Sequence, residues 1–442
     1  MAIVRHRRLW LALLAEVLLL GALQRFDDWR YETMPIKFVE TAVLCGIAFF
    51  VAASAFVRLP PGRLATATFW SVAILLQIVA LPLAPGDDIW RYQWEGKVQN
   101  AGFNPYLLAP NDEQLQPLRA HFPDWNRINH RDYSAIYPPG AELIFAALSR
   151  FAATPLVYKL LFAAADLAAI AILVRLIGGS SRHIDAVWYA WNPLVVYSFA
   201  GAAHFDILMI VPMLAGIWFF LRSRSSKEPA GRWRYAIFGA VAMALAISIK
   251  LIPLLLLPVC AFALGRRAWA LAISIIIPAL LSLPFGFPRV PIWDSLGRFI
   301  YVTRLNDMFW WIIEETGWPN THQKNYNYNV VILIAVVVVS FFFIRNWKRG
   351  LLWAMGTALI LSPVFHPWYC TWVLPLAAWR RADAWQVLSV TLFAYYLFWD
   401  ERLFLLPWHS EPWLRGFILI PPIAAALLAL WRRSQRDELE PG

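Results

Sequence analysis

The sequence predicts an all-α protein that crosses a membrane many times. Of its 442 residues, 60% are hydrophobic and 15% are charged, and the mean hydropathy is +0.54. These values lie outside the range of soluble globular proteins. The apolar residues form runs that approach the length of about 20 residues needed for a membrane-crossing helix, with short basic clusters between them. We therefore expect a bundle of about 11 to 14 transmembrane helices.

The apolar runs define the expected spans. The first lacks a small-residue cleavage site, so we expect it to be a retained helix rather than a signal peptide. The runs at 186–200, 250–264 and 367–379 are short and contain prolines, which predicts kinked or half-buried helices there. The runs lie at about 9–25, 38–57, 66–84, 155–177, 186–200, 204–222, 235–249, 250–264, 268–285, 329–345, 350–364, 367–379, 383–399 and 414–431.

Clusters of Arg and Lys occupy every second connection between the runs, and the positive-inside rule assigns those connections to the cytoplasm. Both termini are expected on that side of the cell (plasma or inner) membrane. The other connections are expected to face outward and lie at about 26–37, 85–154, 286–328 and 400–413. None is long enough for a soluble domain with its own core. The sequence therefore predicts one integral-membrane domain over 1–442, with 85–154 and 286–328 as its two large outward loops.

The net charge of +11 does not indicate nucleic-acid binding, because the basic residues follow the pattern of membrane topology. The three cysteines, Cys45, Cys260 and Cys370, lie in apolar runs and have no metal-binding spacing. They are expected to be core residues. We expect no metal and no other cofactor, and the expected surroundings are membrane lipids.

The most informative stretch is GDDIWRYQWEGKVQNAGFNPY at 86–106, directly after the third span. Asp87 and Asp88 suit general-base work, because one carboxylate can take a proton while its neighbour's charge raises the proton affinity of the pair. Arg91 and Lys97 suit a phosphate, and aromatic faces such as that of Trp94 can pack against a sugar. The alternative is an interfacial helix whose acids cap its N-terminus.

Four stretches together resemble a known family. They are 87–106, IYPPGAELIF at 136–145, WNPLVVYSFAGAAHFD at 191–206 and KLIPLLLLP at 250–258, with HPWY at 366–369 as a weaker fifth. They resemble the GT-C superfamily of polytopic glycosyltransferases, and within it the bacterial polyprenyl-phosphate-mannose-dependent mannosyltransferases of glycosyltransferase family 87. The resemblance implies a GT-C-type helical bundle whose outward loops carry short juxtamembrane helices.

The resemblance also implies that the first outward loop carries the catalytic acid and that transfer inverts the anomeric centre. Asp88 would be the base that deprotonates the acceptor hydroxyl. Related mannosyltransferases space the acids as DxD, and by the distance to Gly102 the second acid matches Asp88. Asp87 falls on the spacer position, so the adjacent pair departs from the family pattern and the role of Asp87 stays open.

Other polar residues near span ends are candidates for substrate contact. Lys250 and His366 would join Arg91 and Lys97 in binding the donor phosphate or sugar, while His204, Asp206, Tyr137 and Trp94 would orient a substrate. Each has a plainer interpretation. Lys250 can extend to the headgroups, His204 and Asp206 can cap a helix, and a lone His such as His366 is usually structural.

We therefore expect a membrane enzyme that transfers a hexose, with mannose expected, from a polyprenyl-phosphate-linked donor to an extracytoplasmic glycan or glycolipid. A lipid or sugar transporter or flippase without transferase chemistry is the first alternative, and a scaffold or polymerase subunit without its own chemistry is the second. The position of the acids distinguishes an enzyme from the first alternative. Transport sites lie near the midplane on broken helices, whereas these acids cluster at one surface. The second alternative predicts that Asp87 and Asp88 are replaceable.

Overall fold

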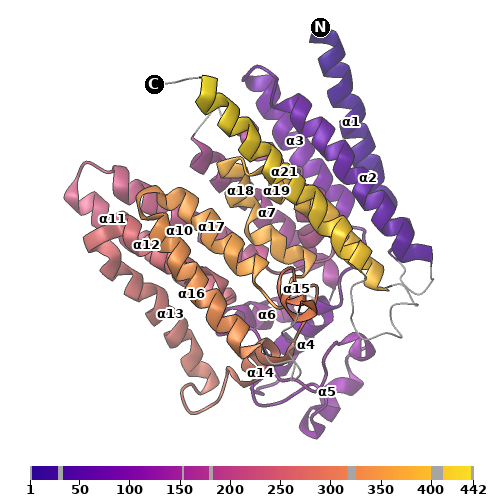
Figure 1. Ribbon diagram of the computed structural model, residues 1–442. Helices are drawn as coiled ribbons and strands as arrows, with labels where there is room; N and C mark the ends of the chain where they lie inside the picture. The colour runs from indigo at the N-terminus through magenta and orange to yellow at the C-terminus, as the bar shows by residue number, and fades with distance from the viewer. Residues whose placement is uncertain are drawn as a thin grey trace.

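The computed structural model describes residues 2–27, 33–151, 154–178, 183–316, 325–399 and 412–439. Within these ranges the chain is a bundle of helices without strands, apart from one isolated bridge between Leu305 and Val364 (Figure 1). The all-α prediction is therefore confirmed. The long helices are α1 (Ala2–Ala22), α2 (Thr33–Phe56), α3 (Arg63–Ala80), α7 (Pro155–Ile177), α10 (Ile207–Ser225), α11 (Pro229–Ile249), α16 (Tyr326–Phe342), α17 (Trp347–Ile360) and α21 (Pro412–Leu439).

Shorter helices complete the fold, several of them where the sequence predicts broken spans. Asn192 accepts a hydrogen bond from the backbone N of Leu194, which begins a helix at Pro193. The shorter helices are α4 (Asp88–Asn100), α5 (Gln116–Ala120), α6 (Pro139–Phe151), α8 (Val187–Ala190), α9 (Pro193–Val196), α12 (Leu257–Leu264), α13 (Ile273–Ser282), α14 (Asp294–Val302), α15 (Trp310–Glu315), α18 (Leu374–Arg380) and α19 (Asp383–Thr391).

Seven helical stretches in the described ranges are long and apolar enough to cross a membrane, and a bent pair at 327–360 would make eight. One of the seven, Ile252–Phe285, doubles back. Its middle reaches the basic connection after α10, where Arg267 donates to the carbonyl of Ser223 (2.7 Å). Its end returns to the first loop, where Asn104 donates to the carbonyl of Phe285 (2.8 Å). The protein is therefore a polytopic membrane protein, and the count of 11 to 14 spans stays a prediction because broken spans escape a test of single helices.

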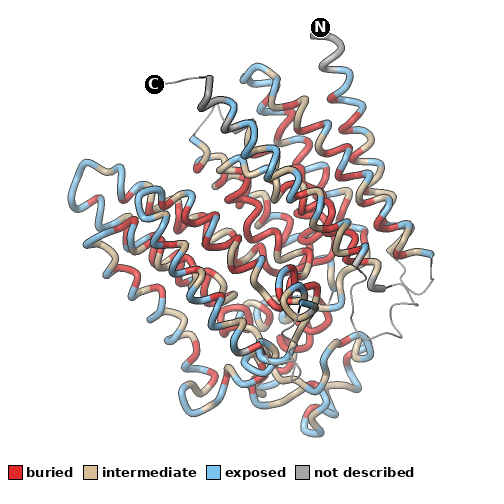
Figure 2. Tube along the Cα trace, in the orientation of Figure 1, coloured by how far each residue is buried: buried red, intermediate tan, exposed pale blue. Residues whose placement is uncertain are grey.

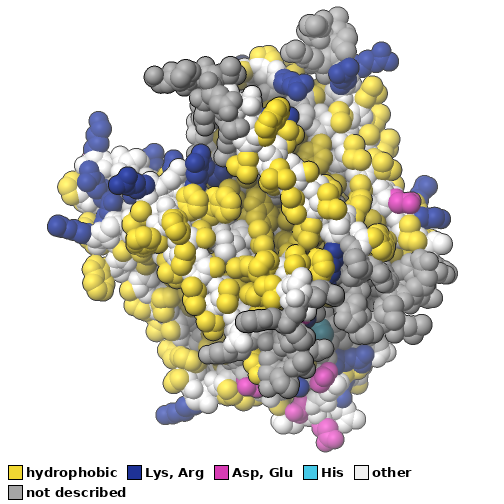
Figure 3. Space-filling model, in the orientation of Figure 1, with side chains coloured by type: hydrophobic (Ala, Val, Ile, Leu, Met, Phe, Trp, Pro, Cys, Tyr) yellow, Lys and Arg dark blue, Asp and Glu magenta, His cyan; other side chains and the backbone are white. Residues whose placement is uncertain are grey.

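The outer helices expose apolar side chains, as lipid-facing helices do. Ile276 and Leu280 of α13 are more than half exposed, as are Ile420 and Leu427 of α21. Buried residues lie where the helices face one another (Figure 2). In the space-filling view, hydrophobic side chains cover the middle of the visible face, between Lys and Arg at the top and left and several acids at the lower edge (Figure 3). This distribution is that of a protein embedded in a bilayer.

The two ends of the bundle differ. We call the end that carries both chain termini the terminal end, and the end that carries α4, α5 and α6 the loop end (Figure 1). At the terminal end Arg381 pairs with Asp185 (2.7 Å), both from connections expected to be cytoplasmic. At the loop end the backbone N of Ala84 donates to Asp27 (2.7 Å), which joins two connections expected to face outward. Each contact thus joins segments that the alternation of basic clusters assigns to the same side of the membrane.

Candidate active site

The segment before α4 brings Asp88 against a second loop that is far away in sequence. Gly86 donates from its backbone N to the carbonyl of Ala202 (2.8 Å). A Cβ at Gly86 would lie 3.3 Å from that same oxygen and 3.5 Å from the ring of His204, so the absence of a side chain permits the close approach. The helix then begins at Asp88, where a carboxylate is favoured by the helix dipole.

The Asp88 carboxylate is surrounded by hydrogen-bond donors and remains partly exposed. Asn129 donates to Oδ1 (2.9 Å), and the hydroxyl of Tyr92 lies 3.5 Å from Oδ2. Nδ1 of His204 also lies 3.5 Å from Oδ2, and the Asp88 side chain keeps 25% of its surface exposed. Burial opposes ionisation, but His204 and Asn129 outweigh it and hold the pKa of Asp88 well below its usual range. This carboxyl is therefore ionised and accessible at neutral pH.

Asp87 is placed differently. It is exposed, and its pKa is raised by desolvation and then by the negative charge of Asp88. The two adjacent acids thus have unlike environments, with the donors converging on Asp88. The geometry favours Asp88 as the functional carboxylate, as the spacing to Gly102 predicts.

An aromatic stack connects His204 to His366. The ring of Trp368 lies 3.8 Å from the ring of His204 and 4.2 Å from the ring of His366, nearly parallel to both. His366 Nδ1 lies 3.0 Å from the hydroxyl of Tyr395. Burial lowers the pKa of His366 to about 3, so this imidazole is neutral at neutral pH.

Lys250 and Asp206 form a buried pair beside this stack. The ammonium lies 2.5 Å from Oδ1 of Asp206, which also accepts a hydrogen bond from the indole of Trp372 (2.6 Å). Three aromatic rings surround the ammonium at 4.9 Å, those of Phe205, Tyr369 and Trp372. Lys250 thus points into the protein toward its counter-ion, while 15% of its side chain remains exposed. It is therefore not a cation that merely extends to the headgroups.

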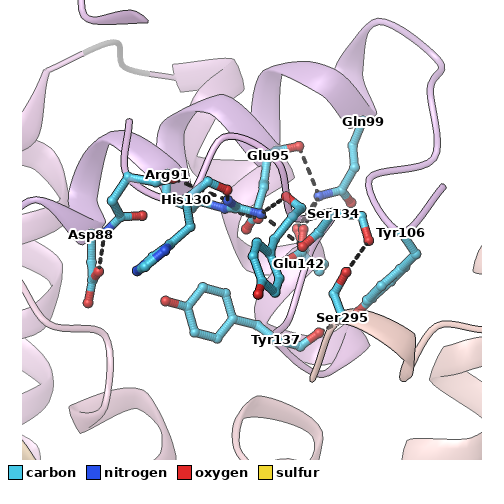
Figure 4. Close-up of polar contacts among 12 residues, drawn as sticks. Asp88, Arg91, Glu95, Gln99, Tyr106, His130, Ser134, Tyr137, Glu142 and Ser295 are labelled. Carbon is cyan, nitrogen blue, oxygen red and sulfur yellow. Dashed lines mark hydrogen bonds and ion pairs between the residues drawn. The ribbon is translucent and has the colours of Figure 1, made fainter. Parts of the chain in front are cut away.

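Arg91 has a different role from the one the sequence predicts. Its five N–H groups bind Glu95 (2.7 Å) and four backbone carbonyls of the loop that follows, at residues 129, 130, 133 and 134 (Figure 4). This leaves no donor for a phosphate. We therefore assign Arg91 to the shape of the loop, which carries Asn129 to Asp88, rather than to the donor phosphate.

Lys97 and Trp94 lie away from Asp88. Nine residues of helix place Lys97 about 13 Å further along the α4 axis, where its ammonium lies 4.8 Å from the ring of Phe122. Trp94 is buried and packs against Phe122 and Trp125 inside the loop. Neither faces the candidate site. Both support the fold of the loop.

Tyr137 does reach the site. Its ring packs against Tyr92 and Phe205, neighbours of Asp88 and Asp206. Its backbone carbonyl accepts a hydrogen bond from the hydroxyl of Tyr106 (2.6 Å). Burial raises the pKa of Tyr137, and so does the charge of Asp88, so its hydroxyl stays protonated. The prediction that it orients a substrate remains open.

Comparison with known proteins identifies the family of the chain. Residues 14–266 match the family described as Alpha-(1->6)-mannopyranosyltransferase, N-terminal domain, which is more than half of the chain. The chain belongs to this mannosyltransferase family. The resemblance to polytopic mannosyltransferases is thereby confirmed.

Two relatives show how far sequences diverge within this family. The chain is 25% identical over 256 residues to the probable alpha-(1->6)-mannopyranosyltransferase of Mycolicibacterium smegmatis. This alignment covers 48% of this chain and 46% of the relative. It is 24% identical over 364 residues to alpha-(1->6)-mannopyranosyltransferase A of Mycobacterium tuberculosis. This alignment covers 72% of this chain and 66% of the relative. The chain thus spans about half to two thirds of the length of these relatives. No solved structure matches it.

Several residues near Asp88 and Lys250 were not predicted from the sequence. Asn129 comes from a polar loop with no motif, and its position depends on Arg91. Trp372 and Tyr395 come from expected spans, where aromatic residues read as lipid-facing or core. Trp368 belongs to the HPWY stretch, which directed attention to the histidine instead. Only the His-Trp spacing in that stretch could have suggested a stack.

Two carboxyl groups are buried inside the bundle, on helices that the sequence predicts as uninterrupted spans. Asp166 of α7 accepts hydrogen bonds from Gln77 (2.6 Å) and Tyr189 (2.7 Å), which is a satisfied structural cluster. Glu16 of α1 is 1% exposed. Among the described residues, no group of three or more His, Cys, Asp or Glu side chains could hold a metal ion.

Proposed function

We propose that this protein transfers a mannosyl residue from a polyprenyl-phosphate-linked donor to a hydroxyl of a glycan or glycolipid at the extracytoplasmic face of the membrane. The observation that carries the proposal is the convergence at the loop end of Asp88, His204, Lys250 and His366, four side chains from separate parts of the chain. An ionised, partly exposed carboxylate at the end of a membrane bundle can meet both an acceptor from water and a donor anchored in lipid.

The donor class follows from the orientation of the bundle. The loop end lies opposite both termini (Figure 1), and the positive-inside rule directs the basic connections to the cytoplasm. A site at the loop end then faces away from the supply of nucleotide sugars. The sequence also has no glycine-rich loop or βαβ pattern that would hold a nucleotide. A sugar on a lipid phosphate can reach the site with its apolar tail still in the bilayer.

The chemistry is a direct displacement. Asp88 accepts the proton of the acceptor hydroxyl, whose oxygen forms a bond to the anomeric carbon as the bond from that carbon to the phosphate oxygen breaks. The phosphate keeps the bonding electrons. One displacement inverts the anomeric centre, so a β-linked donor gives an α-linked product. The names of the relatives specify α-(1→6) mannosyl transfer, and we propose the same linkage here.

The departing phosphate requires cations or hydrogen-bond donors. Lys250 is the candidate cation, because it lies beside the histidine stack with part of its side chain exposed. Its charge is already balanced by Asp206, so the donor phosphate would have to share the ammonium with that carboxylate. The neutral imidazole of His366 would act as a hydrogen-bonding group.

Replacing Asp88 tests the assignment. Asp88→Asn keeps the shape and hydrogen bonds of the side chain but cannot accept a proton, so we expect transfer from polyprenyl-phosphate mannose to fall by at least about 10³-fold. Asp132→Asn, at an exposed acid of the same loop, should retain transfer within about twofold. Wild-type rates in Asp88→Asn membranes with equal protein content would remove Asp88 as the base.

A transporter remains the second candidate, and the intramembrane carboxyls Glu16 and Asp166 are the observation in its favour. Asp166 is bound by structural partners, and both acids lie on different helices from the loop-end cluster. Transport of a lipid-linked sugar into reconstituted vesicles, lost in Glu16→Gln but retained in Asp88→Asn, would favour this function over transfer.

A further inference from the structure

His204 is held in one orientation by contacts on both sides of its ring. Its backbone N donates to the carbonyl of Ser198 (2.8 Å), and the preceding residue, Ala203, has a left-handed φ of 62°. One face of the ring stacks on Trp368 at 3.8 Å. The ring edge with Cε1 and Nε2 lies close to Gly86, where a Cβ would be 3.5 Å away. The imidazole is 3% exposed and cannot swing toward solvent.

The held ring presents Nδ1 to Asp88. This nitrogen lies 3.5 Å from Oδ2 of Asp88, is buried, and has no hydrogen-bond partner within the described part of the chain. The other carboxylate oxygen, Oδ1, is occupied by the amide of Asn129 at 2.9 Å. Asp88 therefore turns Oδ2 toward the imidazole, while Oδ1 faces Asn129. Hydrogen bonds of catalytic groups are often long before substrate arrives.

The chemistry of transfer gives this arrangement a use. The acceptor hydroxyl releases a proton that Asp88 must take, but a carboxyl group is ordinarily a stronger acid than an imidazolium, by about two to three pKa units. Imidazoles, in contrast, accept protons near neutral pH. A proton on Oδ2 would therefore move readily to an unpartnered imidazole nitrogen beside it.

We propose that Nδ1 of His204 receives from Asp88 the proton that the acceptor hydroxyl releases. The inference rests on the proposed function, in which Asp88 is the base. In the first step the O–H bond of the acceptor breaks, its proton binds Oδ2, and the oxygen displaces the phosphate at the anomeric carbon. In the second step the proton passes from Oδ2 to Nδ1, which leaves Asp88 ionised and His204 as an imidazolium. Before the next turnover the proton returns from Nδ1 to Oδ2 of Asp88, whose side chain is 25% exposed, and passes from there to water.

Negative charge and an aromatic face lie next to the His204 ring. The carboxyl groups of Asp87 and Asp88 supply negative charge from the start of α4. The face of Trp368 covers the ring and stabilises a cation through its π-electrons. Beyond Trp368 lies His366, which is held neutral because burial lowers its pKa to about 3, so it adds no competing positive charge. The charge of Lys250 is balanced by Asp206 at 2.5 Å.

The test is the pH profile of His204→Gln in the purified protein. Gln can fill the site and form hydrogen bonds but cannot take a proton, so we expect kcat at pH 7.5 to fall about 10- to 100-fold while the donor KM stays within about threefold. The acid limb of the profile should also move to lower pH, since only a carboxylate then has to stay ionised. His121→Gln, at an exposed loop histidine, should change neither the rate nor the limb.

A second variant keeps the inference testable where His204→Gln folds poorly. Trp368→Phe retains an apolar ring under His204 but stabilises a cation less, so the acid limb should move to lower pH by about half a unit. An acid limb that stays at the wild-type pH in both variants would overturn the proton transfer. If Asp88→Asn is inactive in that case, the proposed function still stands. Full activity of Asp88→Asn would remove both.

Discussion

At the scale of single residues, the candidate site depends on side chains that hold the loop in place without facing the reaction. Arg91 is the clearest case. Its guanidinium gathers four carbonyls between residues 129 and 134, and Asn129, within that segment, donates to Asp88. A buried arginine can therefore control the environment of the acid from a position three residues further along α4.

Arg91→Lys tests this role. Lysine keeps the charge, but its three N–H donors cannot satisfy the five acceptors that Arg91 binds. Buried carbonyls therefore lose their hydrogen bonds. We expect a loss of about 2 kcal/mol of stability and a fall in kcat of at least about tenfold, because Asn129 shifts away from Asp88. Thermal unfolding in detergent and initial rates measure the two effects.

The matched control for Arg91 is Arg127→Lys. Arg127 belongs to the same loop, but its side chain is 55% exposed, lies 3.5 Å from Asp124 and stacks on the ring of Trp90 at 3.9 Å. A lysine ammonium can keep part of this cation–π contact, so the change should alter stability by less than about 1 kcal/mol. Equal losses in the two variants would mean that the guanidinium contacts of Arg91 have no special role.

Asp88 can be proposed from the sequence because an acid at a span end has few structural uses, and its spacing to Gly102 separates it from Asp87. Its role as the base stays a prediction. Arg91 and Lys97 could not be assigned, because a basic residue near a carboxylate looks the same in sequence whether it binds a phosphate or a carbonyl. Only the path of the loop decides, and that path is set by contacts between residues about 40 positions apart.

At the scale of elements, α4 is fixed to α6 by a contact between their backbones. Gly96 of α4 faces the last turns of α6, and a Cβ there would lie 2.3 Å from the carbonyl oxygen of Phe145 and 2.7 Å from Oγ of Ser149. Gln99 adds a hydrogen bond to the carboxylate of Glu142 on α6 (2.9 Å). The helix that presents Asp88 is therefore positioned along its length by its neighbour.

Gly96→Ala should force these helices apart. The clash is with backbone, which cannot move aside as a flexible side chain can, so we expect a loss of about 2 kcal/mol together with reduced transfer activity. The control is Gly297→Ala in α14, where nothing lies within 4 Å of the added methyl group. That change should be neutral or stabilise by up to about 1 kcal/mol. Equal unfolding midpoints of the two variants in detergent would contradict the close packing.

Elements were predicted well where a single periodic run forms them. The spans at 38–57, 66–84, 155–177, 204–222 and 235–249 correspond to α2, α3, α7, α10 and α11. The irregular stretches were harder. The run at 186–200 becomes the short helices α8 and α9 and a π-helical turn at Tyr197–Gly201. Its prolines predicted the break, but the return of residues 202–204 onto Gly86 depends on a contact across the bundle.

At the scale of the whole molecule, the charge pattern and the position of the candidate site are related. Basic connections meet at the end with the termini, and the acids, histidines and Lys250 of the candidate site gather at the other end. The all-α bundle could be predicted from the sequence, while its orientation in the membrane stays a prediction. The convergence of segments from 86 to 372 could not, because residues that are distant along the chain carry no sign of their contact.

The most direct test of the central claim is the choice of donor by the purified protein. We predict that polyprenyl-phosphate mannose alone lengthens a synthetic α-mannoside acceptor by one hexose, read by mass, and that Asp88→Asn supplied with the same donor gives no product. Polyprenyl phosphates carrying glucose, galactose or arabinose form the comparison panel, with a nucleotide-linked mannose as the remaining arm. Product from the nucleotide sugar and none from the lipid-linked sugars would contradict the account.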